Sequence, residues 1–438
     1  MLNRFAADYL ETLGNADFRP TPKVAGRLSS YDGLLMEAVG LQLPVGTVCR
    51  VGDQVEAEVI GFRGGRTILM NLGGPAPLLP QTCVRPVGSP GEAEVGAALL
   101  GRVVDGAGKP IDGLGPIRGA ASWPLAGKLQ GPLDRGRVLE PLDVGVRAIN
   151  GLLTVGQGQR IGIMAGSGVG KSVLLGMMVR AAQADVVVIG LIGERSREVA
   201  DFLETKVAGE ALKRSVIVAV PANHSPVLRI RGALRTHAIA EAFRAEGKRV
   251  LLIMDSLTRV AHAGREIGLA LGEPASARGY PPSAIAMLPG LIERAGADRN
   301  GTGSITAIYT VLADGDDNAD PVVDAARSIL DGHIVLSRAL AERGVYPAID
   351  LGPSVSRVMT DIVPREHQHA ARVLRRHLAT YEENRDLVLM GAYRPGADPA
   401  IDAAIACHPA IIDYIRQDAD AVVSLEEAAA ELTGVFGG

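Results

Sequence analysis

One stretch of the chain, IMAGSGVGKSVLLGMMV at residues 163–179, places a glycine-rich loop and one lysine between two apolar runs. The first run has the length of a buried strand, and the second is typical of a buried helix. Glycines let the backbone approach a ligand closely, and the first turn of a helix presents free N–H groups and the positive end of its dipole. This strand, loop and helix therefore predict a site for phosphate groups.

Two residues of this loop have separate predicted roles. Lys171 is expected to reach the β and γ phosphates of a nucleotide, and the Ser172 hydroxyl is expected to bind Mg²⁺. The strict motif has glycine six residues before the lysine, where this chain has Ala165. That residue ends the strand, so its methyl group is a small intrusion. The predicted nucleotide-binding segment comprises Gly166, Ser167, Gly168, Val169, Gly170, Lys171, Ser172 and Val173.

Two acidic residues follow other apolar runs of the chain. Asp255 ends RVLLIMD, and Glu194 follows VVVIGLI. At the carboxyl edge of a parallel sheet, Asp255 could hold the Mg²⁺ hydration shell, and Glu194 could orient and polarise a water for in-line attack on the γ-phosphorus. The alternative is that Asp255 caps a helix, and that Glu194 and Glu198 only favour the dipole of a helix start. Spacing alone leaves the role of Glu194 open.

The order of apolar runs predicts an α/β chain with a small N-terminal β-barrel and a C-terminal helical part. Short β-type runs separated by Gly, Pro and Asp turns predict a barrel over residues 21–90. Strand and helix patterns alternate over residues 91–358, which predicts a mostly parallel sheet covered by helices. Residues 359–438 show helical patterns. Residues 1–20 predict an amphipathic helix that either folds back on its own domain or docks on a partner.

Composition excludes several classes of protein. With 45 Lys+Arg against 49 Asp+Glu and 3% aromatic residues, neither a basic tail nor a stacking surface for nucleic acid is expected. Three scattered cysteines suggest reduced thiols in the cytoplasm. Asp8 and Glu11 interrupt any signal-peptide core, so a membrane role is expected to come through partners. His367 and His369 fall on different sides of a helix and are expected on a solvated face rather than at a metal.

Seven motifs occur in an order that resembles the catalytic-subunit family of rotary ATPases over roughly residues 22–400. These motifs are GSGVGKS, GERSREV, LLIMDSLTR, PASARGYPPS, GSITAIYTV, DGHIVLSRALAERGVYPAID and SVSRVM. Within that family the chain is most similar to the flagellar and type III secretion export ATPases. Residues 140–178 are very like the flagellar branch, which also tolerates alanine at the position of Ala165. The resemblance implies a RecA-like central domain that binds ATP and Mg²⁺.

The resemblance also implies roles for individual residues. Glu194 matches the catalytic glutamate that activates water, with Arg195 beside it, and Lys171, Ser172 and Asp255 match the phosphate-loop lysine and the two Mg²⁺ residues. Tyr346 in GVYPAID matches the aromatic residue that stacks on adenine. Arg357 in SVSRVM matches the arginine finger, which completes the site of a neighbouring subunit. From the residues alone, without the resemblance, Tyr346 is better interpreted as a core aromatic residue and Arg357 as part of a surface ion pair.

An arginine that works in a neighbour requires a ring, and a chain with both Glu194 and Arg357 can build every site from copies of itself. The resemblance therefore implies a homohexamer. It places EPASARGYPPS, residues 273–283, at the central pore, where a coiled-coil stalk protein enters. Further implied partners are a stator-like regulator at the N-terminal helix, membrane proteins of the export gate, and export substrates with their chaperones. Nucleic acid is not an expected partner.

The predicted function is that of an ATP-hydrolysing motor that delivers and unfolds substrates of flagellar type III export, at the cytoplasmic face of the inner membrane. A type III secretion ATPase of an injectisome is the alternative. A catalytic subunit of an F- or V-type ATP synthase is less favoured because of the expected docking helix. A ring helicase of the transcription-terminator kind is also less favoured, because residues 22–90 contain few aromatic and basic residues.

Overall fold

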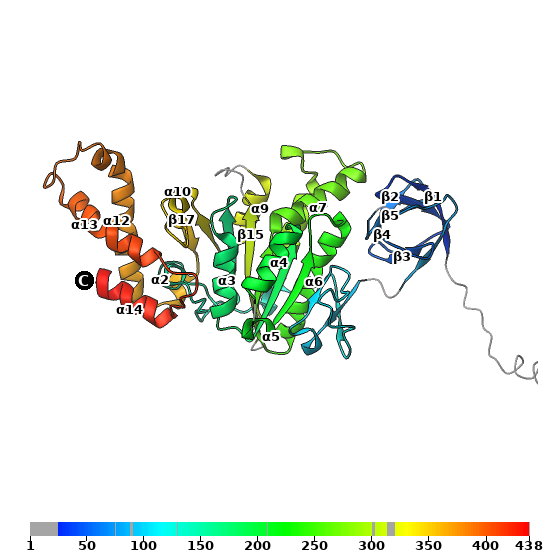
Figure 1. Ribbon diagram of the computed structural model, residues 1–438, viewed down its shortest axis with the longest axis horizontal. Helices are drawn as coiled ribbons and strands as arrows, with labels where there is room; N and C mark the ends of the chain where they lie inside the picture. The colour runs from blue at the N-terminus through cyan, green and yellow to red at the C-terminus, as the bar shows by residue number, and fades with distance from the viewer. Residues whose placement is uncertain are drawn as a thin grey trace, which may run out of the picture. The chain divides into compact units, whose positions relative to one another are not determined.

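The computed structural model describes residues 25–74, 76–87, 91–128, 130–207, 209–299, 303–312 and 320–437 (Figure 1). The amphipathic docking helix expected over residues 1–20 lies outside the described residues. The chain divides into two compact units, Met1–Pro90 and Gly91–Gly438. No helix among the described residues is long and apolar enough to cross a bilayer.

The described part of the first unit is a closed antiparallel barrel with strand order β1-β2-β5-β4-β3-β6. Buried and less buried residues alternate along β4, so that one face of the strand fills the barrel. Gly64 and Gly65 connect β4 to β5 with φ values of 54° and 73°, as a two-residue hairpin loop requires. The strands are β1 (Gly26–Tyr31), β2 (Leu35–Val39), β3 (Val48–Val51), β4 (Val55–Arg63), β5 (Arg66–Asn71) and β6 (Cys83–Pro86).

The second unit is built on a sheet with strand order β17-β16-β10-β15-β13-β11-β12-β8, and β14 pairs with β15 off this path. Neighbouring strands from β16 to β8 are parallel, whereas β17 and β14 pair antiparallel. The strands are β8 (Val103–Val104), β10 (Arg160–Ala165), β11 (Val186–Ile192), β12 (Ser215–Val220), β13 (Arg249–Asp255), β14 (Gly296–Ala297), β15 (Ser304–Leu312), β16 (Gly332–Leu336) and β17 (Ile349–Ser356). A separate ribbon pairs β7 (Glu92–Val95) with β9 (Ala121–Pro124).

Helices cover both faces of this sheet, because its central strands are buried on both sides. Helix α6 packs against β11, β12 and β13, and α7 and α9 pack against β15. Side chains of α3 and α4 share one core with the other face of the sheet. The helices of this central part are α2 (Arg147–Leu152), α3 (Lys171–Ala181), α4 (Ser196–Thr205), α5 (Glu210–Lys213), α6 (Pro226–Ala245), α7 (Leu257–Ala270), α8 (Pro282–Ile292), α9 (Pro321–Ile329) and α10 (Arg338–Glu342).

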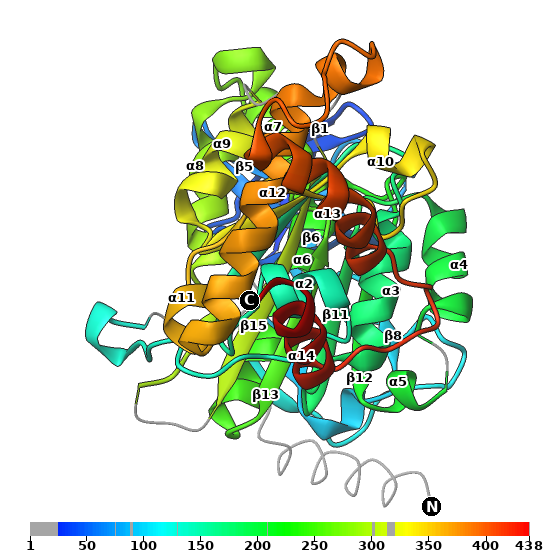
Figure 2. The same cartoon turned by 90° about the vertical axis from the view of Figure 1, so that its left-hand side faces the viewer.

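Among the C-terminal helices, α12 packs on α13 and α14, and all three of these pack on α2 (Figure 2). They are α11 (Met359–Ile362), α12 (Arg365–Leu389), α13 (Pro399–Ile415) and α14 (Leu425–Phe436). Leu374, Tyr414 and Phe436 belong to the same core as the sheet. The prediction that His367 lies on a solvated face of α12 is wrong. His367 is buried, and its Nε2 lies 2.6 Å from the Gly151 carbonyl oxygen. The predicted fold class, a barrel followed by an α/β sheet and a helical C-terminal part, is confirmed.

Candidate nucleotide-binding and catalytic site

The predicted site residues gather at the carboxyl ends of β10, β11 and β13. These parallel strands end at Ala165, Ile192 and Asp255, so the segments that follow them meet at one edge of the sheet. The two acidic residues and the phosphate loop therefore come together because of strand direction, although Lys171 and Asp255 are 84 positions apart in the chain.

The phosphate loop leaves a buried strand end and enters a helix at Lys171. Ala165 is 2% exposed, so its methyl group points into packed protein and leaves the loop itself unchanged. Gly168 and Gly170 have φ values of 78° and 87°, a left-handed conformation that favours glycine. Gly170 is the N-cap of α3 and has no side chain to cap it. The first-turn N–H groups of α3 are thus open to an anion, and no acidic residue stands in that turn to compete.

Lys171 contacts both acidic residues. Its Nζ lies 2.5 Å from Asp255 Oδ1 and 3.7 Å from Glu194 Oε1. Asp255 Oδ1 also accepts a hydrogen bond of 2.6 Å from the hydroxyl of Thr310, on β15. Glu194 is 8% exposed, and its Oε1 has no hydrogen-bond partner among the described residues. The ammonium group of Lys171 thus faces two buried carboxylates. Oε1 of Glu194 remains without a hydrogen-bond donor among the described residues.

Burial raises the pKa of the Glu194 carboxyl, and the negative charge of Asp255 raises it further. The positive charges of Lys171 and Arg259 act in the opposite direction without reversing the shift. A carboxylate whose basicity is increased in this way accepts a hydrogen bond from water more strongly. Glu194 therefore has the burial, the free oxygen and the basicity that a water-orienting group needs.

The donors at this site fit Mg²⁺. Asp255 offers a carboxylate and Ser172, in the first turn of α3, offers a hydroxyl, and both are the hard oxygen ligands that Mg²⁺ prefers. The part of the chain that the structure describes holds no group of three or more His, Cys, Asp or Glu residues arranged for a metal. With Asp255 and Ser172 as its protein ligands, Mg²⁺ would take its other ligands from phosphate and water.

Tyr346 lies beside the phosphate loop and is 44% exposed, which excludes the core aromatic considered above. A Cβ atom placed on Gly170 would lie 3.4 Å from its ring. Together they border a pocket of about 390 Å³, of the size found for small ligands. The lining residues are Gly168, Gly170, Val173, Leu174, Met177, Tyr346, Pro347, Gln417 and Ala419. The pocket thus continues from the phosphate loop to an aromatic side chain, as a nucleotide base requires.

Gln417 and Ala419 were missed by sequence reasoning. Gln417 donates its backbone N–H to the Tyr346 carbonyl at 2.8 Å, and its side-chain amide donates to the Gly145 carbonyl at 2.9 Å. These bonds hold the segment after α13 against the pocket. A lone glutamine between two helices carries no motif, so nothing in the sequence pointed to it.

Two predicted residues do not join this cluster. Arg195 is the N-cap of α4, with a side chain that is 83% exposed and an ion pair of 3.5 Å to Glu198. Arg357 follows β17, which runs antiparallel to β16 with Ile349 opposite Leu336 and Ser356 opposite Gly332. The start of β17, next to Tyr346, is therefore at the phosphate-loop end of the sheet, and Arg357 is at the other end.

Arg357 is exposed, and it forms no ion pair with any residue described by the structure. Its Nη2 donates only a long hydrogen bond of 3.4 Å to the Arg327 carbonyl. The surface ion pair considered above is therefore wrong. The guanidinium group is free to contact another molecule, and it cannot reach the phosphate loop of its own chain.

Comparison with known proteins agrees with this geometry. Residues 145–356 match the nucleotide-binding domain of the ATP synthase alpha/beta family, and residues 363–434 match the T3SS EscN ATPase C-terminal domain. The chain is 52% identical to a flagellum-specific ATP synthase of Pseudomonas aeruginosa, over 95% of this chain and 94% of that one. The chain therefore belongs to the ATP synthase alpha/beta family. The expected enzyme class, an ATPase, is thereby confirmed.

This chain is similar to flagellar and type III secretion ATPases along nearly its whole length. A type 3 secretion system ATPase of Xanthomonas euvesicatoria is 46% identical over 94% of this chain and 93% of its own. The structure of the assembled ATPase EscN from enteropathogenic E. coli has a TM-score of 0.89 and 41% identity, and it covers 94% of this chain and 100% of that one. A related structure shows EscN in complex with its central stalk EscO, with a TM-score of 0.87.

Proposed function

We propose that this ATPase is the motor of a flagellar type III protein export apparatus, and that it couples hydrolysis of MgATP to delivery and unfolding of export substrates. The observation that carries the catalytic part is Glu194, whose buried Oε1 has no hydrogen-bond partner among the described residues and lies 3.7 Å from Lys171 Nζ. The flagellar assignment is supported by the sequence of residues 140–178, which resembles the flagellar branch, and by the flagellar relative at 52% identity. An injectisome ATPase is the second candidate, since a relative of that kind is 46% identical.

Lys171 exchanges partners when nucleotide binds. The triphosphate accepts hydrogen bonds from the N–H groups of residues 166–173, and Lys171 Nζ turns from Asp255 to the β and γ phosphates. This frees Asp255, which with Ser172 would hold Mg²⁺. The ion supplies positive charge at the phosphate oxygens. Glu194 accepts a hydrogen bond from a water molecule. This orients a lone pair of the water toward the γ-phosphorus, in line with the bond from that phosphorus to the bridging oxygen, which breaks. Tyr346 stacks on the base.

The site is completed by a second copy of the chain. Arg357 is exposed at the end of the sheet opposite to its own phosphate loop, so it can reach the γ-phosphate only in a neighbour. Since each copy contributes both Glu194 and Arg357, a closed ring of identical chains supplies every site, and we propose a homohexamer. Arg195, which follows Glu194 and is exposed at the start of α4, stays a proposed catalytic residue beside Glu194. The solved relative EscN is itself an assembled ATPase.

The remaining partners follow from the proposed export function. Residues 273–283 would line the pore and contact a coiled-coil stalk, as EscN binds a central stalk. The N-terminal helix would bind a stator-like regulator. Export-gate membrane proteins would hold the ring at the cytoplasmic face of the inner membrane, and substrates with their chaperones would arrive there. Nucleic acid has no part in this function.

The test is deletion of the gene, with filament assembly and secretion of injectisome substrates measured separately in the same strain. Loss of filaments, restored by the wild-type gene and not by a Lys171→Ala variant, is the expected result. Normal filaments with lost injectisome secretion would move the proposal to the second candidate. Normal filaments and normal secretion would refute both.

The purified chain offers an independent test of the ring. ATP turnover per chain should rise steeply with protein concentration, because each site needs a neighbour's Arg357. Added RNA should leave turnover unchanged. RNA-dependent turnover would instead support a helicase and contradict the export function.

A further inference from the structure

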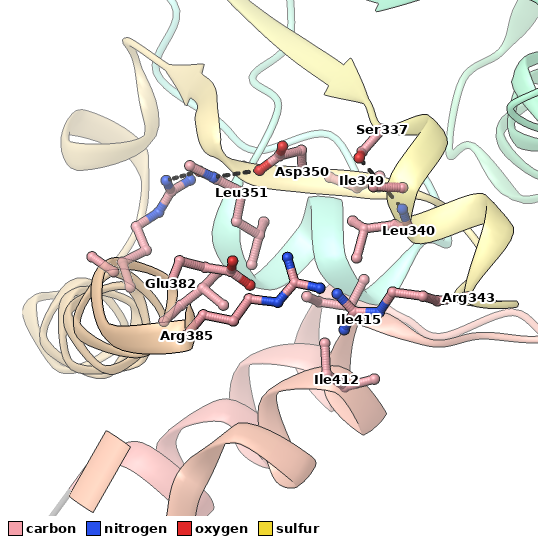
Figure 3. Close-up of a pocket in the computed structure, with 15 residues that line it drawn as sticks. Ser337, Leu340, Arg343, Ile349, Asp350, Leu351, Glu382, Arg385, Ile412 and Ile415 are labelled. Carbon is pink, nitrogen blue, oxygen red and sulfur yellow. Dashed lines mark hydrogen bonds between the residues drawn. The ribbon is translucent and has the colours of Figure 1, made fainter. Parts of the chain in front are cut away.

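A second cavity lies apart from the nucleotide pocket, between the edge of the sheet and the C-terminal helices (Figure 3). It has a volume of about 530 Å³, within the range of small-molecule sites. One wall consists of α10 and the first half of β17, and the other consists of α12 and α13. We call this cavity the α10–α12 pocket. None of the residues assigned above to the catalytic site lines it.

Two guanidinium groups converge in the α10–α12 pocket. Arg343 follows α10 and Arg385 belongs to α12, and in Figure 3 their side chains extend from opposite walls toward the same part of the cavity. Among the residues that the structure describes, neither side chain forms an ion pair or a hydrogen bond. Like charges that approach each other without a counter-ion are unfavourable. A bound anion would remove that cost.

The other charged groups of the cavity do not neutralise these two. The Arg375 guanidinium donates hydrogen bonds to the backbone carbonyls of Leu351, at 2.6 Å, and Leu152, at 3.0 Å. The Asp350 carboxylate accepts a hydrogen bond of 3.1 Å from the backbone N–H of Gly352. Glu382 lines the cavity one helical turn before Arg385 and forms no ion pair with a described residue. Three arginines line the cavity against two carboxylates, so an excess of one positive charge remains.

A single imidazole next to the cavity responds to these charges. Burial lowers the pKa of His408, on α13, and the charges of Arg343 and Arg385 lower it further, while Glu382 raises it. The three charged groups thus act at one place.

The rest of the lining is apolar. Leu340 and Ile349 come from one wall, and Leu378, Ile412 and Ile415 come from the other. Figure 3 shows Leu340 on one side and Ile412 on the other side of the two guanidinium groups. Phosphate or sulfate alone would leave these side chains uncovered. A ligand that gains from both features has a negatively charged head and an apolar body.

We propose that the α10–α12 pocket binds a small organic anion with an apolar body, and that this ligand changes the affinity of the nucleotide pocket. The two pockets share two stretches of backbone. Tyr346 and Pro347 line the nucleotide pocket, and Ile349 lines the other. Ile415 lines the α10–α12 pocket, and Gln417 lines the nucleotide pocket. A ligand that displaces α10 from α12 therefore moves two walls of the nucleotide pocket.

The probe for this site is 8-anilinonaphthalene-1-sulfonate, which is an apolar anion whose fluorescence rises on binding. We expect the Arg343→Ala/Arg385→Ala variant to weaken probe binding about tenfold, since it removes two contacts to the anion. Glu382→Gln should tighten binding, because it removes a repelling charge. A denaturant midpoint equal to that of wild type checks that the gain does not come from apolar surface exposed by misfolding. Arg376→Ala is the matched control, since Arg376 is exposed on α12 outside the pocket. Decanoate should displace the probe, and inorganic phosphate should not.

Titration with ADP separates the two pockets. We expect ADP to change the probe's dissociation constant by a finite factor of about fivefold or more that then levels off, and the probe to change ADP affinity by the same factor. An increase in the probe's dissociation constant without limit would place the probe in the nucleotide pocket and overturn the proposal. Unchanged probe binding in the double arginine variant, or no effect of ADP, would overturn it as well. None of these readouts depends on the export function.

Discussion

Two clusters of buried charge in the nucleotide-binding unit differ in how far their hydrogen-bonding groups are satisfied. In the phosphate-site cluster, Lys171 faces Glu194 and Asp255, and Glu194 Oε1 has no hydrogen-bond partner among the described residues. In the α6 cluster, Arg294 donates to both oxygens of Glu241, at 2.7 and 3.0 Å. Trp123 adds a third hydrogen bond of 2.9 Å to the same carboxylate.

This difference separates a site for chemistry from a structural element. In the α6 cluster every nitrogen of Arg294 has an acceptor, since Nη1 donates to the Leu125 and Leu234 carbonyls. Such a network specifies packing and needs no ligand. The phosphate-site cluster has more negative than positive charge and an unused acceptor, so a bound cation can balance its charge and a bound water can use its acceptor.

The largest expected effect concerns the phosphate-site cluster. Glu194→Gln keeps the shape of the side chain and removes its negative charge and basicity. We expect kcat for ATP hydrolysis to fall by about 10²–10⁴-fold, with nucleotide binding retained. Phosphate release and fluorescent-nucleotide titration measure the two quantities. A turnover within a few-fold of wild type would refute the assigned role. The apo variant should also melt at a higher temperature than wild type at neutral pH, because a costly buried charge is gone.

In the α6 cluster the expected loss is in stability rather than chemistry. Arg294→Ala leaves the Glu241 carboxylate buried and unpaired, so the free energy of unfolding should fall by about 3–5 kcal/mol. Denaturant unfolding measures it, and turnover per folded molecule should stay near wild type. The matched control is Lys213→Ala, which breaks an exposed pair of 2.6 Å to Glu210 and should cost less than about 0.5 kcal/mol. Equal losses in the two variants would contradict the contrast between buried and exposed pairs.

Nucleotide affinity can be lowered without a change in either cluster. Tyr346→Ala removes the aromatic face beside Gly170, and we expect the dissociation constant for ATP to rise about tenfold, as loss of one stacking contact predicts. Tyr346→Phe keeps the ring and serves as the control. If both variants bind ATP like wild type, the base lies elsewhere.

The remaining expected effects are in pH dependence, and they have opposite signs in the two regions. The folded pKa of Glu194 is raised, so its contribution to apo stability is full below the unfolded pKa and is lost as pH rises through the folded value. Burial, with the charge of Arg294, lowers the pKa of His237 on α6 to about 3. Its contribution is therefore full above the unfolded pKa near 6.5 and is lost as pH falls toward 3.

Unfolding free energies measured between pH 3 and 7 test these signs. The slope should fall by up to about 1.4 kcal/mol per pH unit in His237→Gln, which cannot charge. For turnover, the acidic limb of kcat/KM should lie above the ordinary glutamate value of 4.5, because Glu194 must be ionised to orient water. A limb at or below that value would show that another group controls the rate.

The success of sequence reasoning differs between these regions for a physical reason. Glu194 and Asp255 were predicted to lie at the carboxyl edge of the sheet, because each stands at the end of a buried strand and parallel strands end at one edge of a sheet. His367 was misplaced because an amphipathic pattern does not show which carbonyl a buried side chain will meet, here that of Gly151. The roles of Arg195, Tyr346 and Arg357 stay predictions.

The amino-acid sequence by itself determined the local chemistry: the left-handed glycines of the phosphate loop, the helix that starts at Lys171, and the two strands that precede Glu194 and end at Asp255. These depend on backbone sterics and periodicity, which act over a few residues. Only the tertiary structure decided that Gln417 closes the nucleotide pocket, that Arg357 points away from its own site, and that Arg343 meets Arg385. Those placements depend on how distant segments pack, and no short pattern in the chain encodes that.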